Sequence, residues 1–222
     1  MFARIRASSG ATMLGEFLML VVGINLALWF EGKFDDLDDA RTEQQYLQGL
    51  HDDLTADVER LEQVITFNRS KTENLAALLP QLPDLQQADR ATLAAAMFEP
   101  SGYDFFQPSD FTYRSMQESG DFRLLSDGPT KTALLRLVRR YREIELLQLN
   151  FIQALDDAYI PLVMRDFDIL QMRLANPELL DNLVFRNFFA FAIEDTGQRT
   201  KQYENARDQA SALLGQIQAQ MR

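Results

Sequence analysis

The chain contains no cysteine, one histidine and one tryptophan among its 222 residues. The absence of cysteine excludes disulfides, thiol nucleophiles, iron–sulfur clusters and cysteine-ligated zinc. The single histidine, His51, excludes any site within one chain that needs two imidazoles. Basic residues are outnumbered by acidic ones. The chain has 22 lysines and arginines and 33 aspartates and glutamates, which gives a net charge of −11. Such a polyanion binds nucleic acid poorly, so we expect no nucleic-acid partner.

One long apolar run is present near the N-terminus, although the mean hydropathy of the whole chain is only −0.22. Residues 11–30 read ATMLGEFLMLVVGINLALWF and carry a single formal charge, on Glu16. As a helix, this run would extend about 30 Å, which is the thickness of the hydrocarbon core of a bilayer. Trp29 and Phe30 close the run, where aromatic side chains favour the membrane interface. We therefore predict a transmembrane helix over residues 11–30.

The flanks of this run predict that it is an uncleaved anchor with a defined orientation. A cleaved signal peptide would have a shorter apolar core and a small-residue cleavage motif after it. Arg4 and Arg6 precede the run, whereas residues 31–39 contain five acids and one lysine. Because positive flanks stay in the cytoplasm, we predict a cytoplasmic tail over residues 1–10 and a periplasmic domain over residues 31–222.

Small and polar residues within the predicted anchor each have two interpretations. Ala11, Gly15 and Gly23 lie on one stripe, where small residues let transmembrane helices pack closely, but ordinary glycine content explains them equally well. Glu16 and Asn25 are polar at membrane depth, which is typical of groups that contact a partner or, for Glu16, of an acid near the headgroups. These two residues are nine apart and therefore face opposite sides of the helix. The expected partners are the lipid bilayer and either a membrane or periplasmic protein or a second copy of the chain.

The rest of the chain shows the periodicity of long helices. Apolar residues recur at three- and four-residue steps over residues 47–65, 134–155 and 180–217. Proline is absent before residue 80, so the anchor can continue into the first of these helices without a break. A short helix is expected over residues 90–98, and few runs favour strands. We predict an all-α fold, in which an N-terminal transmembrane helix is followed by an antiparallel bundle of three to four long helices.

Individual residues predict where several helices begin and end. Ser109 is a candidate cap for a short helix that stops at Gly120, where glycine can adopt positive φ. Ser126 or Asp127 should cap the next helix. Pro161 should kink or end that helix. Gly197 is a candidate break in the last one.

Several short blocks resemble a known protein family. They read LGEFL at residues 14–18, VVGI at 21–24, EQQYL at 43–47 and TYRSMQESG at 112–120. The last block contains Tyr113, Ser119 and Gly120, which match a threonine–aromatic and serine–glycine element. On these motifs the chain resembles bacterial single-pass membrane proteins known only as a domain of unknown function. The resemblance implies an anchor, a helical extracytoplasmic domain and no established activity. We expect the anchor to lie in the bacterial inner membrane.

Aromatic residues gather in one irregular segment, which we interpret as a candidate binding loop. They are Phe98, Tyr103, Phe105, Phe106, Phe111 and Tyr113. These side chains could line a groove for a ligand or a partner. Alternatively, they could plug the end of a helical bundle, where large side chains are needed.

No pattern in the sequence predicts chemistry. Asp52, Asp53 and Asp57 lie near His51, but we interpret them as a solvated helix face and not as a metal site. We predict no catalytic residues, no cofactor and no metal, and therefore no enzyme. The expected function is that of a non-catalytic scaffold or accessory subunit in an envelope membrane complex. The alternative is a ligand-sensing periplasmic bundle that signals laterally to a partner.

Overall fold

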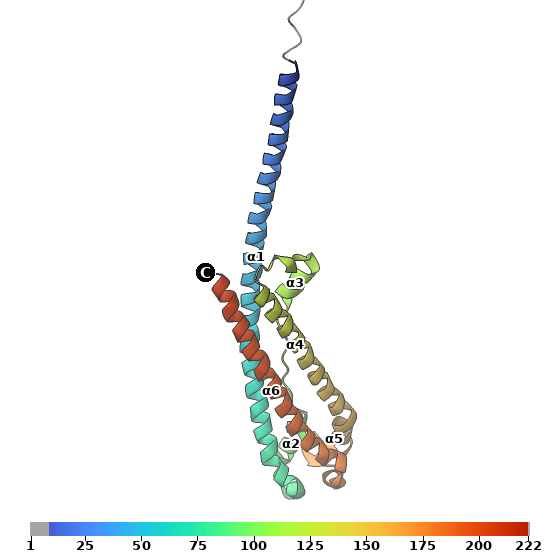
Figure 1. Cartoon of the computed structure of the whole chain (residues 1–222). Helices are drawn as coiled ribbons and strands as arrows, with labels where there is room; N and C mark the ends of the chain where they lie inside the picture. The colour runs from blue at the N-terminus through green and yellow to red at the C-terminus, as the bar shows by residue number, and fades with distance from the viewer. Residues whose placement is uncertain (1–8, 222) are drawn as a thin grey trace, which may run out of the picture.

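The computed structural model describes residues 9–221, without the side chains of residues 9–14, 27, 28, 30–32, 34 and 35. Nearly all of this part of the chain is helical, which confirms the all-α prediction. Three long helices form an elongated bundle: α1 (Ser9–Leu78), α4 (Gly128–Ala154) and α6 (Leu183–Gln220) (Figure 1). Helix α6 packs against both of the others.

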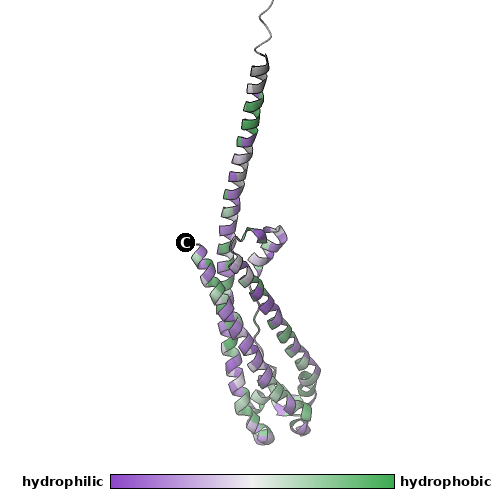
Figure 2. Ribbon diagram, in the orientation of Figure 1, coloured by the Kyte–Doolittle hydropathy of each residue, from purple (hydrophilic) through white to green (hydrophobic). Residues whose placement is uncertain are grey.

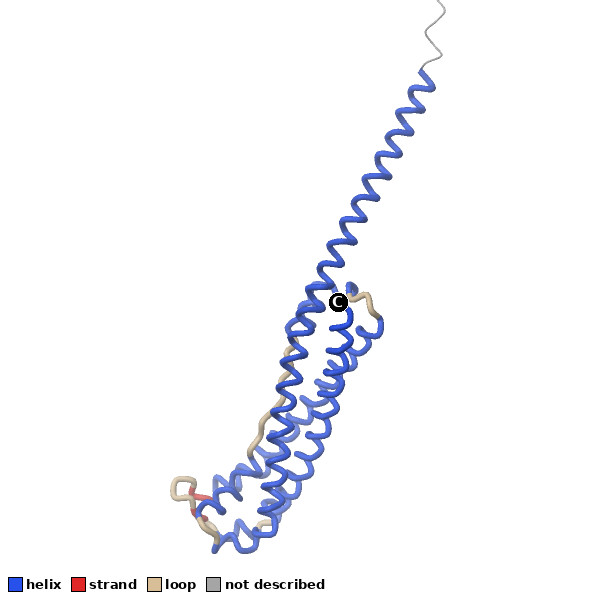
Figure 3. Tube along the Cα trace, turned by 90° about the vertical axis from the view of Figure 1, so that its left-hand side faces the viewer, coloured by secondary structure: helices blue, strands red, loops and turns tan. Residues whose placement is uncertain are grey.

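The three long helices do not simply alternate in direction. Helices α1 and α4 run the same way, and α6 returns between them, so that the C-terminus lies near the middle of α1 (Figure 1). The chain crosses back from the end of α1 to the start of α4 partly through an extended segment, residues 102–110 (Figure 3, tan). We call this segment the strap. It occupies the place along the bundle that a fourth long helix would take.

Helix α1 is 70 residues long and continues far beyond the bundle at its N-terminal end (Figure 1). All described side chains of residues 15–41 are exposed, so we call residues 9–41 the stem. The apolar ones gather in a band on the projecting helix (Figure 2). Judged on the described residues, no helix is both long and apolar enough to cross a membrane.

A turn that contains prolines follows the end of α1. The last residue of α1 is Leu78, and the chain continues as the 3-10 helix η1 (Leu79–Gln87), which contains Pro83. The short helix expected over residues 90–98 is confirmed as α2 (Arg90–Phe98). The side chain of Asp89 caps it by accepting a hydrogen bond from the Thr92 N–H at 2.8 Å. A second 3-10 turn, η2 (Glu99–Ser101), leads into the strap.

The short helix α3 (Phe111–Ser119) follows the strap, and the 3-10 turn η3 (Asp121–Leu124) follows α3. Gly120 ends α3 with φ of 79°, which confirms the predicted stop. The predicted cap at Ser109 is wrong, because Asp110 precedes the first helical residue. The Ser109 N–H instead donates to the carboxylate of Asp57 at 2.7 Å.

Helix α4 begins at a cap that the sequence predicts. The Asp127 carboxylate accepts a hydrogen bond from the Thr130 N–H at 2.8 Å. Pro161 lacks an N–H, and the helical hydrogen bonds widen before it into a π-helical turn, η4 (Leu155–Tyr159). Helix α5 (Ile160–Asp166) continues from this turn, so Pro161 distorts the helical path without ending it.

A small hairpin and a capped turn connect α5 to α6. Strands β1 (Phe167–Asp168) and β2 (Arg173–Leu174) pair antiparallel. The 3-10 turn η5 (Pro177–Asp181) follows them, and the Asn182 side chain caps α6. The predicted break at Gly197 is wrong, because α6 is continuous through this residue. Packing against α1 and α4 outweighs the low helix propensity of one glycine.

Candidate functional site

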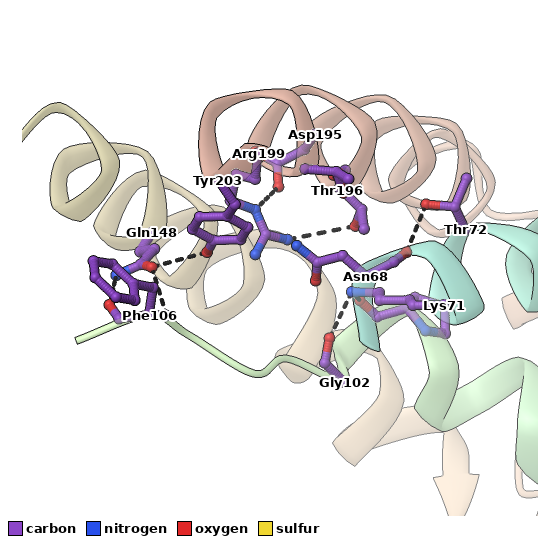
Figure 4. Close-up of polar contacts among 12 residues, drawn as sticks. Asn68, Lys71, Thr72, Gly102, Phe106, Gln148, Asp195, Thr196, Arg199 and Tyr203 are labelled. Atoms are coloured by element: carbon purple, nitrogen blue, oxygen red, sulfur yellow. Dashed lines mark hydrogen bonds and ion pairs between the residues drawn. The ribbon is translucent and has the colours of Figure 1, made fainter. Parts of the chain in front are cut away.

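A layer of polar side chains divides the core of the bundle into two apolar halves. The half nearer the stem is built around residues 47–65 of α1, and the far half begins at Leu75. Between the halves lie five polar side chains, each at most 7% exposed: Asn68, Lys71, Gln148, Thr196 and Arg199. We call these five residues the polar layer (Figure 4). Because buried polar groups need partners, their contacts show what this layer does.

Arg199 forms an ion pair within α6. Its Nε donates to Oδ2 of Asp195 at 2.6 Å, and the Asp195 side chain is itself only 12% exposed. The guanidinium lies 4.5 Å from the centre of the Phe151 ring and 5.3 Å from that of Phe105. The pair and the two rings stabilise a charge that would otherwise be costly to bury.

Lys71 is the second cation of the polar layer. Its Nζ donates to the carbonyl oxygens of Pro100 at 3.1 Å and Gly102 at 2.6 Å, and lies 4.6 Å from the centre of the Phe151 ring. Burial, together with repulsion from the Arg199 charge, lowers the pKa of the Lys71 ammonium to about 7. Two cations therefore share one aromatic ring in the middle of the bundle.

Gln148 joins the strap to α4. Its Nε2 donates to the carbonyl oxygen of Phe106 at 3.1 Å, and its Oε1 accepts from the N–H of the same residue at 3.0 Å. The hydroxyl of Tyr203 on α6 donates to the same Oε1 at 2.8 Å. The side chain of Gln148 thus pairs with the strap as a neighbouring β-strand would.

The strap is held by side chains because an extended segment among helices has no backbone partners of its own. On α1, Arg60 donates to the carbonyl oxygen of Phe105 at 2.9 Å and forms an ion pair with Asp104. Lys71 binds the carbonyl group of Gly102, before this contact, and Gln148 binds that of Phe106, after it. The polar layer and its neighbours therefore fix the course of the strap along the bundle.

Two acids of α1 hold the end of the strap. Asp57 is buried and accepts from the Ser109 N–H, and Asp53 accepts from the Thr112 N–H at 3.0 Å. Burial raises the pKa of the Asp57 carboxyl to about 6, although the Ser109 hydrogen bond opposes this. The interpretation of this region as a solvated helix face is therefore wrong for Asp57, whereas Asp52 is exposed as predicted. Within the part of the chain that the structure describes, no group of acids and histidine is arranged to hold a metal.

Four of the six aromatic residues of the candidate binding loop line a groove between the strap, α3 and α4. The groove has a volume of about 880 Å³ and is lined by Tyr103, Phe105, Phe106 and Tyr113, together with Arg114, Arg142 and Glu145. We call it the strap groove. Because the strap runs along the flank of the bundle, its aromatic side chains do not plug a bundle end (Figure 3).

The other two predicted loop residues lie outside the strap groove. Phe98 is at the end of α2 and packs edge-on against Phe167 at 6.0 Å between ring centres. Phe111 begins α3 and is 80% exposed.

Two of the four blocks that carry the family resemblance, residues 43–47 and 112–120, meet in space. The Tyr46 hydroxyl of α1 donates to Oδ2 of Asp121 at 2.8 Å and lies 3.3 Å from the Ser119 hydroxyl. Gly49 faces Thr112 so closely that a Cβ at Gly49 would lie 2.7 Å from the Thr112 hydroxyl. Tyr113 is buried beside this contact. The two blocks thus form the junction between α1 and α3.

The residues predicted for anchor packing lie on the stem. Gly15 and Gly23 have open space around them, since a Cβ at either would meet no atom within 4 Å. Glu16 is exposed, and the Asn25 amide donates to the Val21 carbonyl of its own helix at 2.7 Å. Trp29 is exposed at the end of the predicted span. The side chains of Ala11 and Phe30, and residues 1–8 of the tail predicted over residues 1–10, lie outside the described residues.

No family model, curated protein or solved structure matches the chain. The resemblance to the family of anchored single-pass proteins therefore stays a prediction.

The polar layer predicts a pH dependence of stability. The folded-state pKa of Lys71, about 7, lies below its ordinary value of 10.5, so the unfolded chain binds more protons between these values. The free energy of unfolding should therefore rise with pH across this window. Lys71→Met should remove this rise, because it removes the titrating charge but keeps a long side chain. Urea denaturation at a series of pH values would measure the slope.

The matched control for this experiment is Lys201→Met, which removes an exposed lysine of α6. It should leave the slope as it is in the unmodified chain. Equal slopes in the Lys71 variant and the unmodified chain would contradict the prediction.

Proposed function

We propose that the chain is a non-catalytic, membrane-anchored helical protein of the bacterial inner membrane that acts by binding. In this proposal it is an interaction or accessory subunit of an envelope complex. The observation that supports it is the stem, where α1 leaves the bundle and presents apolar side chains with no part of the bundle around them (Figure 2). A band of this kind is unfavourable in water, and a bilayer would cover it.

The proposed membrane span is residues 11–30, with Trp29 at one interface. The basic N-terminal flank would stay in the cytoplasm, and the bundle would stand in the periplasm. Residues 31–41 lie between the proposed span and the bundle, and as a helix they extend about 16 Å. The acids of this segment would be solvated there.

A second candidate function is ligand sensing by the bundle. The strap groove favours it, because Gln148 both lines the groove and holds the strap. A small molecule in this groove would contact the strap where its backbone is fixed. A thermal-shift screen would test this function, since a ligand that binds the folded state raises the apparent stability.

The anchor is tested by placing charge in the middle of the proposed span. Leu20→Arg combined with Val22→Arg should release the chain from membranes, because each arginine at the bilayer centre costs roughly 2.5–3.5 kcal/mol. The measurement is the fraction of full-length chain that stays in the membrane pellet after alkaline carbonate extraction.

The matched control carries the same two arginines on the bundle. Leu146 and Leu149 are exposed on α4, so their replacement by arginine should leave the chain in the pellet. An unmodified chain that is extracted by carbonate, or a stem variant that stays in the pellet, would contradict the anchor.

Binding to a partner is tested separately by detergent solubilisation, affinity isolation and mass spectrometry. Repeated isolation of the chain alone would contradict the role as a subunit.

A further inference from the structure

One stretch of this acidic chain is strongly basic. Residues 131–142 contain five lysines and arginines and no acid, although the whole chain has a net charge of −11. This stretch forms the first half of α4. Three of its arginines project over the same side of the helix and face α6.

These arginines line a groove between α4 and α6 that is separate from the strap groove. Its volume is about 530 Å³, and its polar lining is Arg136, Arg139, Arg140, Glu143, Gln209 and Gln216. We call it the arginine groove. Alanine and leucine side chains complete the lining, so an occupant would be partly shielded from water.

The charges in the arginine groove are unbalanced. Glu143 is its one acid, and it is shared by Arg139, at 3.1 Å from Nε, and Arg140, at 3.0 Å from Nη1. Arg140 also donates to Gln202 at 2.9 Å, but its buried Nε has no acceptor. Arg136 makes no hydrogen bond or ion pair with any described residue. Three guanidinium groups against one carboxylate leave the groove with a local charge of +2.

We propose that the arginine groove binds a small phosphate-bearing solute. Planar guanidinium groups bind phosphate oxygens through paired hydrogen bonds. Arg136 and Arg139 are one helical turn apart, so both can reach one ligand. A phosphate monoester carries a charge close to −2 at neutral pH, which matches the excess charge of the groove better than a single carboxylate does. The amides of Gln209 and Gln216 supply further donors.

The position of the groove favours a soluble ligand over a lipid headgroup. The Ser126 N–H, just before α4, binds Glu43, and Leu134 and Leu137 of α4 lie in the same apolar cluster as Leu47 and Leu54. The first half of α4 therefore lies beside residues 43–57 of α1. Arg136 is then about 30 Å along the helix axis from residue 31. This step rests on the proposed anchor, which would place the bilayer surface near that residue.

The proposal is tested by calorimetric titration of the full chain with inorganic pyrophosphate, in nanodiscs of phosphatidylcholine. We expect saturable binding that Arg136→Gln weakens about tenfold, because a charge-assisted pair of hydrogen bonds is lost. Glu143→Gln should tighten binding, since it removes the competing carboxylate. Arg136→Lys keeps the charge but not the paired donors, so it should give an intermediate Kd.

The matched control is Arg186→Gln, which removes an exposed arginine of α6 that lines neither groove. It should leave the Kd unchanged. Equal weakening by the Arg136 and Arg186 variants would overturn the proposal, because binding would then follow net charge alone. Absence of pyrophosphate binding would also overturn it. If the groove contacts nanodiscs of phosphatidylglycerol and does not bind pyrophosphate, the ligand is a lipid headgroup, and the proposal of a soluble ligand is overturned. None of these outcomes depends on carbonate extraction, so failure of the anchor is detected separately.

Discussion

Arg199→Ala is expected to lower the free energy of unfolding by about 3–5 kcal/mol, because it breaks a buried ion pair. The substitution leaves the Asp195 carboxylate without its partner and empties the space over the Phe151 ring. It also removes the repulsion that acts on Lys71, so the pKa of that lysine should rise. Urea unfolding followed by circular dichroism would measure the loss of stability.

Arg207→Ala is the control for this loss. Arg207 lies on the same helix, but its side chain is more exposed and its ion pair is with the adjacent Asp208. A surface pair of this kind contributes at most about 1 kcal/mol. Arg199→Met combined with Asp195→Leu removes both charges and should recover much of the stability, because a buried pair can be replaced by apolar side chains. Equal losses in the Arg199 and Arg207 variants would refute a structural role for the buried pair.

Phe151→Ala should lower the free energy of unfolding by about 3–5 kcal/mol, which is typical when a buried aromatic side chain is truncated. The Phe151 ring is fully buried and lies between the strap and α6, where it contacts Phe105 and Phe191. Both buried cations also lie over it. Equilibrium urea unfolding would again measure the change.

Leu146→Ala provides the control for the aromatic substitution, since Leu146 is 61% exposed on the same helix. The Leu146 substitution should lower the free energy of unfolding by less than about 0.5 kcal/mol. The double variant of Phe151 and Arg199 should lose less than the sum of the single losses, by about 0.5–3 kcal/mol, because the two side chains share one contact. Strict additivity would show that the cation and the ring do not stabilise each other.

The sequence predicts the helices well because their signals are local. The spacing of leucines along α1 and α4, the cap at Asp127 and the stop at Gly120 all act over one or two turns. The failure at Gly197 has a physical reason. Glycine lowers helix propensity locally, but whether a helix breaks depends on the partners that pack against it.

The strap could not be predicted from the sequence, because it has no periodicity. Its extended course depends on side chains far away along the chain, including Arg60 and Gln148. The polar layer leaves a weak signal, since Asn68 and Lys71 continue the apolar stripe of α1 between Ile65 and Leu75. Polar residues at such positions indicate that a polar partner is buried with them. The sequence does not identify this partner as the strap, because the strap meets α1 only in the folded structure. Asp57 illustrates the same limit, because Asp52 and Glu59 on the same helix are exposed and nothing in the sequence sets Asp57 apart from them.

The unbroken course of α1 has a mechanical consequence. A single helix carries the stem, the junction with α3 and two residues of the polar layer, so these parts tilt and rotate together as one lever. Over its length of about 105 Å, a tilt of about 5° at the N-terminal end displaces the far end by about 9 Å. A partner that binds and tilts the stem would therefore displace the far end of the bundle sideways. A partner that binds and rotates the far end would rotate the stem.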